Sequence, residues 1–218
     1  QGSDRPPCLM TLEYRPRSGG ARVPTVALVG KAITFDSGGL SIKPAKGMEE
    51  MKFDMAGGAA VLGAMKAVAA LKPPVRVVGV VPSTENVIGG SAMRPGDILR
   101  SASGKTIEVI NTDAEGRLIL ADALHYALRF QPDYVIDFAT LTGACLVALG
   151  TQVSGMVTND KDLGRAVFDA GEPDRPADQG RARGRACTDP NPRPSPRHCT
   201  PGASADGDTD NMDSMGSF

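Results

Sequence analysis

Tryptophan is absent from this chain of 218 residues, and aromatic residues make up only 4% of it. A hydrophobic core therefore has to be built from Val, Leu, Ile, Ala and Met. Hydrophobic residues account for 41% of the chain and charged residues for 22%. These proportions are typical of a soluble globular protein.

Histidine and cysteine are also scarce, with two and four residues respectively. The cysteines are scattered and none forms a C-x-x-C pair, which excludes a zinc module built from cysteine and histidine. Scattered cysteines favour a reducing compartment, so we expect a cytoplasmic protein. Ser37 and Ser41 have no plausible histidine partner, and a serine nucleophile is not expected.

A strong charge of either sign is lacking as well, because the formal net charge is −1. This balance gives no electrostatic reason to expect a nucleic-acid partner or a membrane surface. We find no apolar run long enough to cross a bilayer and no signal peptide at the start. The sequence therefore predicts neither a membrane nor a nucleic-acid partner.

The chain divides into three regions by composition. Residues 1–22 are polar and rich in proline and glycine, and residues 23–164 are dense in apolar segments. Between positions 169 and 211 there is no Val, Ile, Leu, Phe, Tyr or Met. Such a segment buries too little apolar surface to offset an ordering entropy of about 1–2 kcal/mol per residue. We therefore predict a short N-terminal segment, a central domain and a disordered tail over residues 165–218.

Hydrophobic periodicity places strands and helices alternately along the central region. Alternation of this kind predicts an α/β fold with a mostly parallel sheet flanked by helices. Functional sites in such sheets lie at the carboxyl ends of the strands, where Lys31 and Asp113 fall. We expect strands at 8–14, 25–30, 75–81, 106–110, 134–138 and 154–157, and helices at 58–71 and 115–128.

Four carboxylates stand near the predicted strand ends, at Asp36, Asp54, Asp113 and Glu115. In an extended backbone Asp113 and Glu115 project to one face, which Arg117 would share. Clustered carboxylates repel one another, and neutralising them needs either protonation or cations. Hard oxygen ligands suit divalent metals, and a set this large suggests two ions. The alternative is that each is a solvated helix cap or strand-end residue. Spacing alone leaves both readings open.

Four segments, in this order, resemble the signature segments of the leucine aminopeptidase (cytosol aminopeptidase) family. Residues 30–44 read GKAITFDSGGLSIKP, residues 51–60 read MKFDMAGGAA, residues 111–118 read NTDAEGRL and residues 137–144 read DFATLTGA. The octapeptide at 111–118 is the most specific. The resemblance covers about residues 8–160. It implies an incomplete aminopeptidase catalytic domain over 23–164, preceded by a remnant of the domain linker and first strand.

The resemblance implies two divalent metal ions, zinc or manganese. Asp36 and Glu115 correspond to the carboxylates that bridge the ions, Lys31 and Asp54 to the other ligands of the tighter site, and Asp113 to the ligand of the more exchangeable one. A lysine coordinates a metal only as a neutral amine, so its pKa would have to fall far below the usual value of about 10.4. A simple ion pair with Asp36 would not cause that fall.

Lys43 and Arg117 correspond to the family's two catalytic residues that are not metal ligands. The resemblance implies that Lys43 polarises the scissile carbonyl and stabilises the oxyanion. It implies that Arg117 holds a bicarbonate ion as general base, and that the substrate is a peptide with a free N-terminus. Four further positions correspond to the substrate cleft, namely Met51, Thr140, Leu141 and Gly143.

The chain departs from the family beyond about residue 160. Residues 169–218 carry a bias towards Arg, Pro, Asp, Gly and Ala that is typical of a coding sequence read out of frame. We expect the loss of packing partners to impair activity and to weaken the homo-hexamer that the family forms. The alternative function is a catalytically inactive remnant or a binding module.

Overall fold

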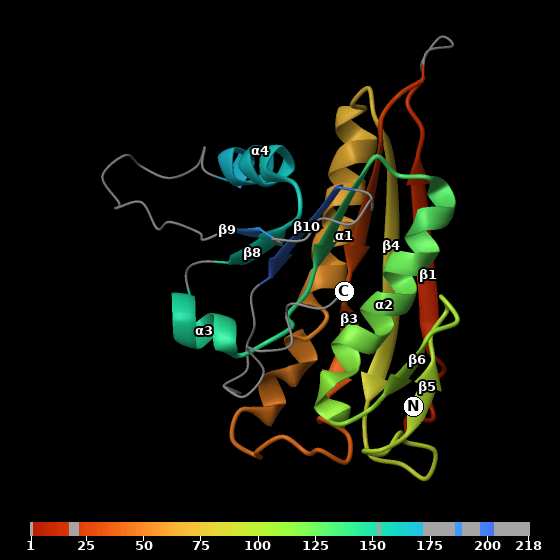
Figure 1. Ribbon diagram of the computed structural model, residues 1–218, viewed down its shortest axis with the longest axis vertical. Coiled ribbons are helices and arrows are strands. Elements are labelled where there is room, and N and C mark those ends of the chain that lie inside the picture. The colour runs from red at the N-terminus through yellow and green to blue at the C-terminus, as the bar shows by residue number, and fades with distance from the viewer. Residues whose placement is uncertain (1, 18–21, 152–153, 172–185, 189–196, 203–218) are drawn as a thin grey trace.

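The computed structural model describes residues 2–17, 22–151, 154–171, 186–188 and 197–202 (Figure 1). Its main sheet runs in the order β1-β4-β2-β7-β10-β8-β9, and β3 pairs with the far part of β4. The strands of this sheet are β1 (Cys8–Tyr14), β2 (Thr25–Gly30), β3 (Ala32–Asp36), β4 (Arg76–Asn86), β7 (Tyr134–Phe138), β8 (Gly155–Thr158), β9 (Ala186–Thr188) and β10 (Arg197–Gly202).

Most neighbours in the sheet run parallel. β2 is parallel to both β4 and β7, β3 is parallel to β4, and β8 is parallel to β9. The edge strand β1 is antiparallel to β4, and β10 lies parallel to β7 but antiparallel to β8. The expected α/β fold with a mostly parallel sheet is confirmed.

Helices cover both faces of the sheet (Figure 1). On one face α1 (Ala56–Leu71) packs Val61 and Met65 against β2 and β4. On the other face α2 (Glu115–Ala127) packs Leu120 and Ala123 against the same strands. β2 and β4 are therefore buried on both faces, which explains why their sequences are continuous apolar runs rather than alternating patterns.

The amino-terminal end of α1 approaches the sheet through glycines. A Cβ on Gly58 would lie 2.7 Å from the Cβ of Ala32, and one on Gly30 would lie 2.7 Å from the Cα of Gly58. The amide of Gly58 donates to the carbonyl of Lys31 over 2.6 Å. Because backbone touches backbone here, the first turn of α1 and the end of β2 are held in close contact beside Lys31.

We expect Gly57→Ala to destabilise the chain by about 1–3 kcal/mol, because its Cβ would overlap the carbonyl oxygen of Phe138. Gly63→Ala, in the same helix, meets no atom within 4 Å and should stabilise the chain by about 0.5–1 kcal/mol. Urea unfolding of the two variants measures both changes. Equal effects of the two substitutions would contradict the close packing inferred at Gly57.

Several predicted elements agree with the structure. The strands predicted at 8–14, 25–30 and 134–138 have the bounds of β1, β2 and β7, and the two predicted helices correspond to α1 and α2. The strand predicted at 106–110 differs, because β6 (Thr106–Glu108) pairs with β5 (Ile98–Arg100) in a separate hairpin. The main sheet instead gains β3, a strand that the glycine-rich sequence after it obscured.

The tail prediction needs correction at its start. α4 (Lys161–Gly171) continues through residues 165–171, where disorder was expected. Leu163, Val167 and Phe168 form its partly buried stripe, and Gly164 packs against Thr158 of β8. The helix can form because these apolar residues, at helical spacing, come before the segment that has none. Two short strands, β9 and β10, also fall in the tail, and its other residues after 171 lie outside the described residues.

One segment, Met48–Leu71, is long and apolar enough to cross a membrane by length and composition. By that measure the prediction that no such run exists is wrong. The segment is not one continuous α-helix, however, because the 3-10 helix η1 (Met48–Phe53) ends before α1 begins. Asp54 is buried at the junction, and α1 packs on the sheet as core helices do. The segment therefore carries no membrane assignment.

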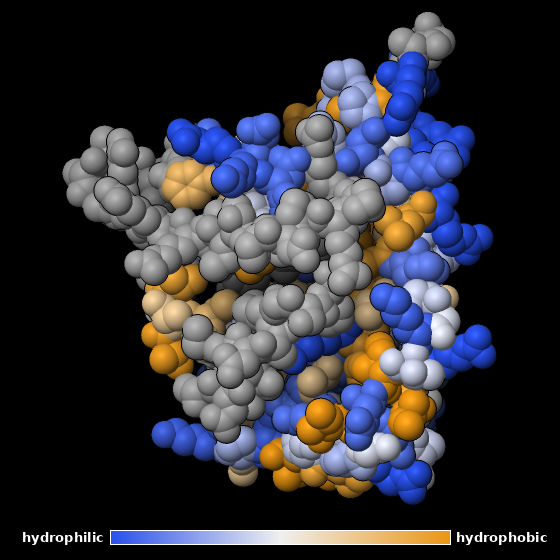
Figure 2. Space-filling view, viewed as in Figure 1, coloured by the Kyte–Doolittle hydropathy of each residue, from blue (hydrophilic) through white to orange (hydrophobic). Residues whose placement is uncertain are grey.

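Figure 2 shows apolar side chains at the surface where α2 and the β5–β6 hairpin lie. Ile98 on β5 is 70% exposed, and Ile110, beyond β6, is 80% exposed. Hydrophilic side chains cover much of the remaining coloured surface on the face shown (Figure 2).

Candidate active site

The site lies at the carboxyl ends of the parallel strands. Lys31 follows β2 directly, Asp36 is the last residue of β3, and Asp54 follows η1. Glu115 is the first residue of α2, and Asp113 lies in the 3-10 turn η2 (Thr112–Ala114) just before it. The sheet thus brings together residues that are as far as 84 positions apart in the sequence.

Lys31 is buried between two carboxylates. Its Nζ lies 2.8 Å from Asp54 Oδ2 and 3.1 Å from Glu115 Oε1. It also donates to the carbonyl oxygen of Thr140 over 2.8 Å. Gly116 leaves room for this side chain, because a Cβ there would lie 2.6 Å from Lys31 Cε. Lys31 is therefore fixed beside the two carboxylates by its surroundings.

Lys43 joins the other two carboxylates. Its Nζ lies 3.1 Å from Asp36 Oδ2 and 2.8 Å from Asp113 Oδ1. The loop that carries Lys43 begins at Gly38 and Gly39, whose φ angles of 83° and 69° suit glycine. This loop folds back, because Lys43 N–H donates to the carbonyl oxygen of Ser37 over 3.0 Å.

Three carboxylates form the centre of the site. Asp36, Asp54 and Glu115 are all buried, and each offers one oxygen within 4.8 Å of the others. Within the described part of the chain, the buried oxygens Asp54 Oδ2 and Glu115 Oε1 accept no hydrogen bond, although both form ion pairs with Lys31. Buried carboxylate oxygens with open acceptor positions suit a hard divalent cation. These residues therefore fit the metal that the resemblance implies.

Burial and mutual repulsion raise the pKa values of two carboxyl groups in the site. Desolvation raises the pKa of Asp54 to about 6, despite the opposing effect of Lys31. Desolvation also raises the pKa of Glu115 to about 7, and the nearby charges of Asp36 and Asp54 add to the rise. Without a bound cation, the site therefore favours the protonated, neutral forms of Asp54 and Glu115.

Lys31 behaves differently from the expectation for a neutral ligand. Desolvation acts to lower its pKa, but the carboxylates of Glu115 and Asp54 outweigh burial and raise it. The protein groups alone therefore keep Lys31 cationic. The partner expected in the ion-pair alternative, Asp36, is instead paired with Lys43.

Asp113 and Glu115 come together for a reason other than the one expected. The sequence argument placed them on one face of an extended backbone, but the structure has a helical turn there, and Glu115 has φ −62° and ψ −33°. Asn111 caps this turn, since its side chain accepts from the Asp113 N–H over 2.8 Å. Arg117 lies in the first turn of α2, two residues after Glu115.

Of the four expected substrate residues, Thr140 and Met51 contact Asp54 of the cluster. Thr140 donates its hydroxyl to Asp54 Oδ1 over 2.6 Å. Met51 is buried in η1, and its carbonyl oxygen accepts the amide of Asp54 at the end of that helix. Leu141 packs against the core beneath α2, and Gly143 is the N-cap residue of α3 (Ala144–Leu149).

Sequence reasoning missed two polar residues that hold the site. Asn86, at the end of β4, donates to Asp36 and Glu115. Thr112 is fully buried, donates to the carbonyl oxygen of Gly38 over 2.6 Å and accepts from the Ser41 amide over 2.8 Å. The only signal for Asn86 in the sequence is that it is a lone amide a few residues after the apolar run that begins β4.

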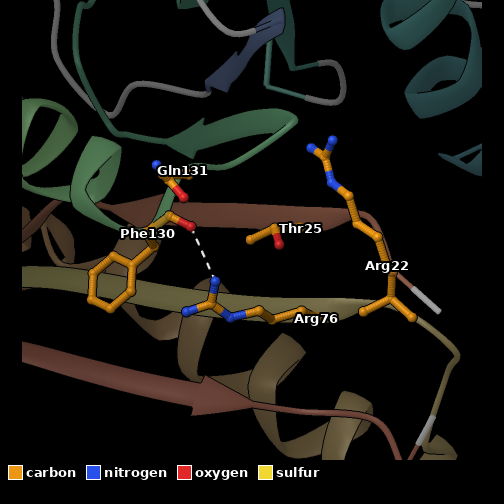
Figure 3. Close-up of a pocket in the computed structure, with 6 residues that line it drawn as sticks. Arg22, Thr25, Arg76, Phe130 and Gln131 are labelled. Atoms are coloured by element: carbon orange, nitrogen blue, oxygen red, sulfur yellow. Dashed lines mark hydrogen bonds between the residues drawn. The ribbon is translucent and has the colours of Figure 1, made fainter. Parts of the chain in front are cut away.

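A pocket of about 560 Å³ lies elsewhere, at the start of β2 and β4 (Figure 3). Arg22 and Arg76 flank Thr25 there. Arg76 already contacts Glu13 and the carbonyl oxygen of Phe130, and Arg22 contacts Asp133 over 2.8 Å. Both arginines of this pocket are neutralised, and the pocket is remote from the carboxylate cluster. We therefore do not place the functional site in this pocket.

The fold and the site define an α/β domain with a buried acidic cluster at the carboxyl edge of its sheet. Comparison with known proteins gives its relationship. The model of the cytosol aminopeptidase family, catalytic domain, matches residues 1–175. The expectation that the chain departs from the family beyond about residue 160 is therefore wrong, because the match continues past α4. The chain belongs to the cytosol aminopeptidase family.

Curated relatives agree. The probable cytosol aminopeptidase of Chlorobaculum tepidum is 57% identical over 173 residues, and that of Geobacter sulfurreducens is 60% identical over 172 residues. Each alignment covers 79% of this chain and 34% of the relative. The relative from Koribacter versatilis is 59% identical over 162 residues, which are 74% of this chain and 31% of that protein. The chain therefore spans about a third of the length of the curated relatives it matches.

Proposed function

We propose that this chain carries the metal centre of an aminopeptidase that removes N-terminal residues, of leucine type, from peptides. The observation that carries the proposal is the buried triad of Asp36, Asp54 and Glu115, with open acceptor positions and a lysine on either side. Membership of the cytosol aminopeptidase family supports it. The names of the relatives also support a cytoplasmic location.

The centre we propose is dinuclear and holds zinc or manganese. Asp36 and Glu115 would bridge the ions, Lys31 and Asp54 would complete one site, and Asp113 the other. When bound, the ions would supply Lewis-acid activation of the carbonyl and a water of lowered pKa. The clustering of these five side chains at one sheet edge supports this ligand set.

Lys43 and Arg117 would do the remaining chemistry. Lys43, which forms ion pairs with Asp36 and Asp113, would donate to the scissile carbonyl oxygen as negative charge develops on it. Arg117 would hold a bicarbonate ion, which would supply the general base. The low number of histidines, two in the chain, is consistent with a base that the protein does not supply.

The substrate would be a peptide with a free N-terminus. Its cleft would be lined by Met51, Thr140, Leu141 and Gly143. The contacts of Thr140 with Lys31 and Asp54 support a cleft beside the carboxylates. A homo-hexamer, as in the family, is the proposed assembly, weakened here by the departure beyond the matched residues.

Hydrolysis of leucine p-nitroanilide with added Mn²⁺ or Zn²⁺ tests the proposal. Turnover that disappears with chelator and returns with metal supports an enzyme. Two bound ions without turnover support the second candidate, an inactive remnant or binding module. Failure to bind any divalent ion would contradict both the metal centre and the aminopeptidase.

Metal binding should release protons. At pH 7 Lys31 is cationic and Glu115, with a pKa of about 7, is close to half protonated, and both must lose their protons to act as ligands. We therefore expect between one and two protons released per chain at pH 7, and a weaker apparent affinity as the pH falls to 5.5. Calorimetric titrations with Mn²⁺ in buffers of different ionisation enthalpy count the protons. Binding without proton release would mean that Lys31 stays charged and is not a ligand.

A further inference from the structure

Asn86 stands where two strands meet the carboxylate cluster. In the parallel pairing of β3 with β4, Asp36 and Asn86 are register partners. The Asn86 side chain is 4% exposed and carries no charge, yet it lies among acceptors from three separate segments. Its Nδ2 lies 2.8 Å from Asp36 Oδ1, 3.3 Å from Glu115 Oε2 and 3.0 Å from the carbonyl oxygen of Thr112.

These contacts fix how the amide is oriented. All three neighbours are acceptors, so the nitrogen, and not the oxygen, of the amide must face them. Its two hydrogens serve three acceptors, of which two are carboxylates. The backbone of Asn86 is held from the other side, because its carbonyl oxygen accepts both the N–H and the hydroxyl of Ser37 over 2.8 and 2.9 Å.

The contacts also select which oxygens remain for a cation. Asn86 takes Oδ1 of Asp36 and Oε2 of Glu115, and the Gly38 amide also donates to Oδ1 of Asp36 over 3.0 Å. The other oxygens, Asp36 Oδ2 and Glu115 Oε1, face the lysines, and Glu115 Oε1 accepts no hydrogen bond. The Asn86 amide therefore orients both carboxylates without adding charge to the cluster.

We propose that Asn86 is a positioning residue that orients the two carboxylates assigned to bridge the metal ions, an inference that rests on the proposed function. A neutral amide suits this task. A lysine in its place would add another cation to the cluster. An apolar residue would remove this donor from Glu115 Oε2 and leave Asp36 Oδ1 with the Gly38 amide. Loss of an outer partner of metal ligands typically lowers metal affinity about 10- to 100-fold.

Asn86→Leu keeps the size of the side chain and removes the amide. With Mn²⁺ titrated calorimetrically into the full chain, we expect its affinity to fall about 10- to 100-fold. We also expect the exchange-coupled electron paramagnetic resonance signal of a bridged Mn²⁺ pair to be lost or replaced by uncoupled ions. The matched control is Ser37→Ala, which removes the hydroxyl that donates to the backbone of Asn86 and accepts from the Gly39 N–H but leaves the Asn86 amide in place. It should keep both the affinity and the coupled signal.

Melting of the metal-free chain checks folding. If Asn86→Leu does not fold, Asn86→Ser, which is too short to reach the carboxylates, replaces it with the same expectation. Affinity and coupling equal to wild type in the folded variant would overturn the inference. So would equal losses in Ser37→Ala, which would place the effect in the local backbone. A wild-type chain that binds no Mn²⁺ would overturn the proposed function itself. That result differs from normal Mn²⁺ binding by the Asn86 variants, which would overturn only the role of Asn86.

Discussion

Lys31→Met is expected to lower the free energy of unfolding of the metal-free chain by about 3–5 kcal/mol at pH 8, the usual effect of removing one partner of a buried ion pair. The side chain of Lys31 is 5% exposed, and those of its partners Asp54 and Glu115 are 4% and 6% exposed. Methionine fills similar space but leaves both carboxylates without their cation. Urea unfolding measures the change.

The effect should depend on pH in a direction that the acidities fix. Asp54 and Glu115 have pKa values raised to about 6 and about 7, above their usual values. The folded chain therefore binds more protons than the unfolded chain between about pH 4 and pH 7, and the stability from this source is lost as the pH rises through that window. Without Lys31 both pKa values rise further. We expect the variant to lose stability more steeply than wild type from pH 5 to pH 8, and to approach wild type at pH 5.

Lys66→Met is the control, because Lys66 is exposed on α1 and its replacement should change stability by less than about 0.5 kcal/mol. A Lys31→Met variant as stable as wild type at pH 8, or one with the same pH dependence, would show that the charge of Lys31 does not balance these carboxylates.

Glu115→Gln is expected to weaken Mn²⁺ binding by about two orders of magnitude or more, beyond the 10- to 100-fold typical of outer partners. The substitution keeps the shape but removes the charge of a proposed bridging ligand. Any hydrolysis of leucine p-nitroanilide should fall to background. Calorimetric titration and the peptidase assay, run side by side, measure the two effects.

Stability separates loss of a ligand from loss of the fold. The metal-free Glu115→Gln chain should be within about 1 kcal/mol of wild type at pH 8. The ion pair with Lys31 is lost, but the cost of burying a charged carboxylate is lost with it. Glu108→Gln, at an exposed residue of β6, should leave binding, activity and stability unchanged. Unchanged affinity and stoichiometry in Glu115→Gln would remove Glu115 from the metal centre.

Much of the architecture was determined by the sequence. The apolar runs at β2 and β7 predicted those strands with the bounds the structure has, and the literal segments at 30–44 and 111–118 pointed to the family. A strand buried on both faces is written as a local run of apolar residues, and a motif is local by definition. Both are therefore visible without any knowledge of what packs against them.

The tertiary structure alone decided how the charges are shared. Nothing in the spacing says that Lys31 pairs with Asp54 and Glu115 while Lys43 pairs with Asp36 and Asp113. The pairing of β6 with β5 and the helical turn at Asp113 were equally hidden.

Asn86 shows the physical reason. Its contacts with Asp36 and Glu115 span 50 and 29 positions, and they depend on the register of β3 on β4 and on where α2 begins. Hydrogen bonds act over about 3 Å, so which donor meets which carboxylate is fixed only when strands and loops take their places. The sequence supplied the kinds of groups at the site, and the packing of the chain chose their partners.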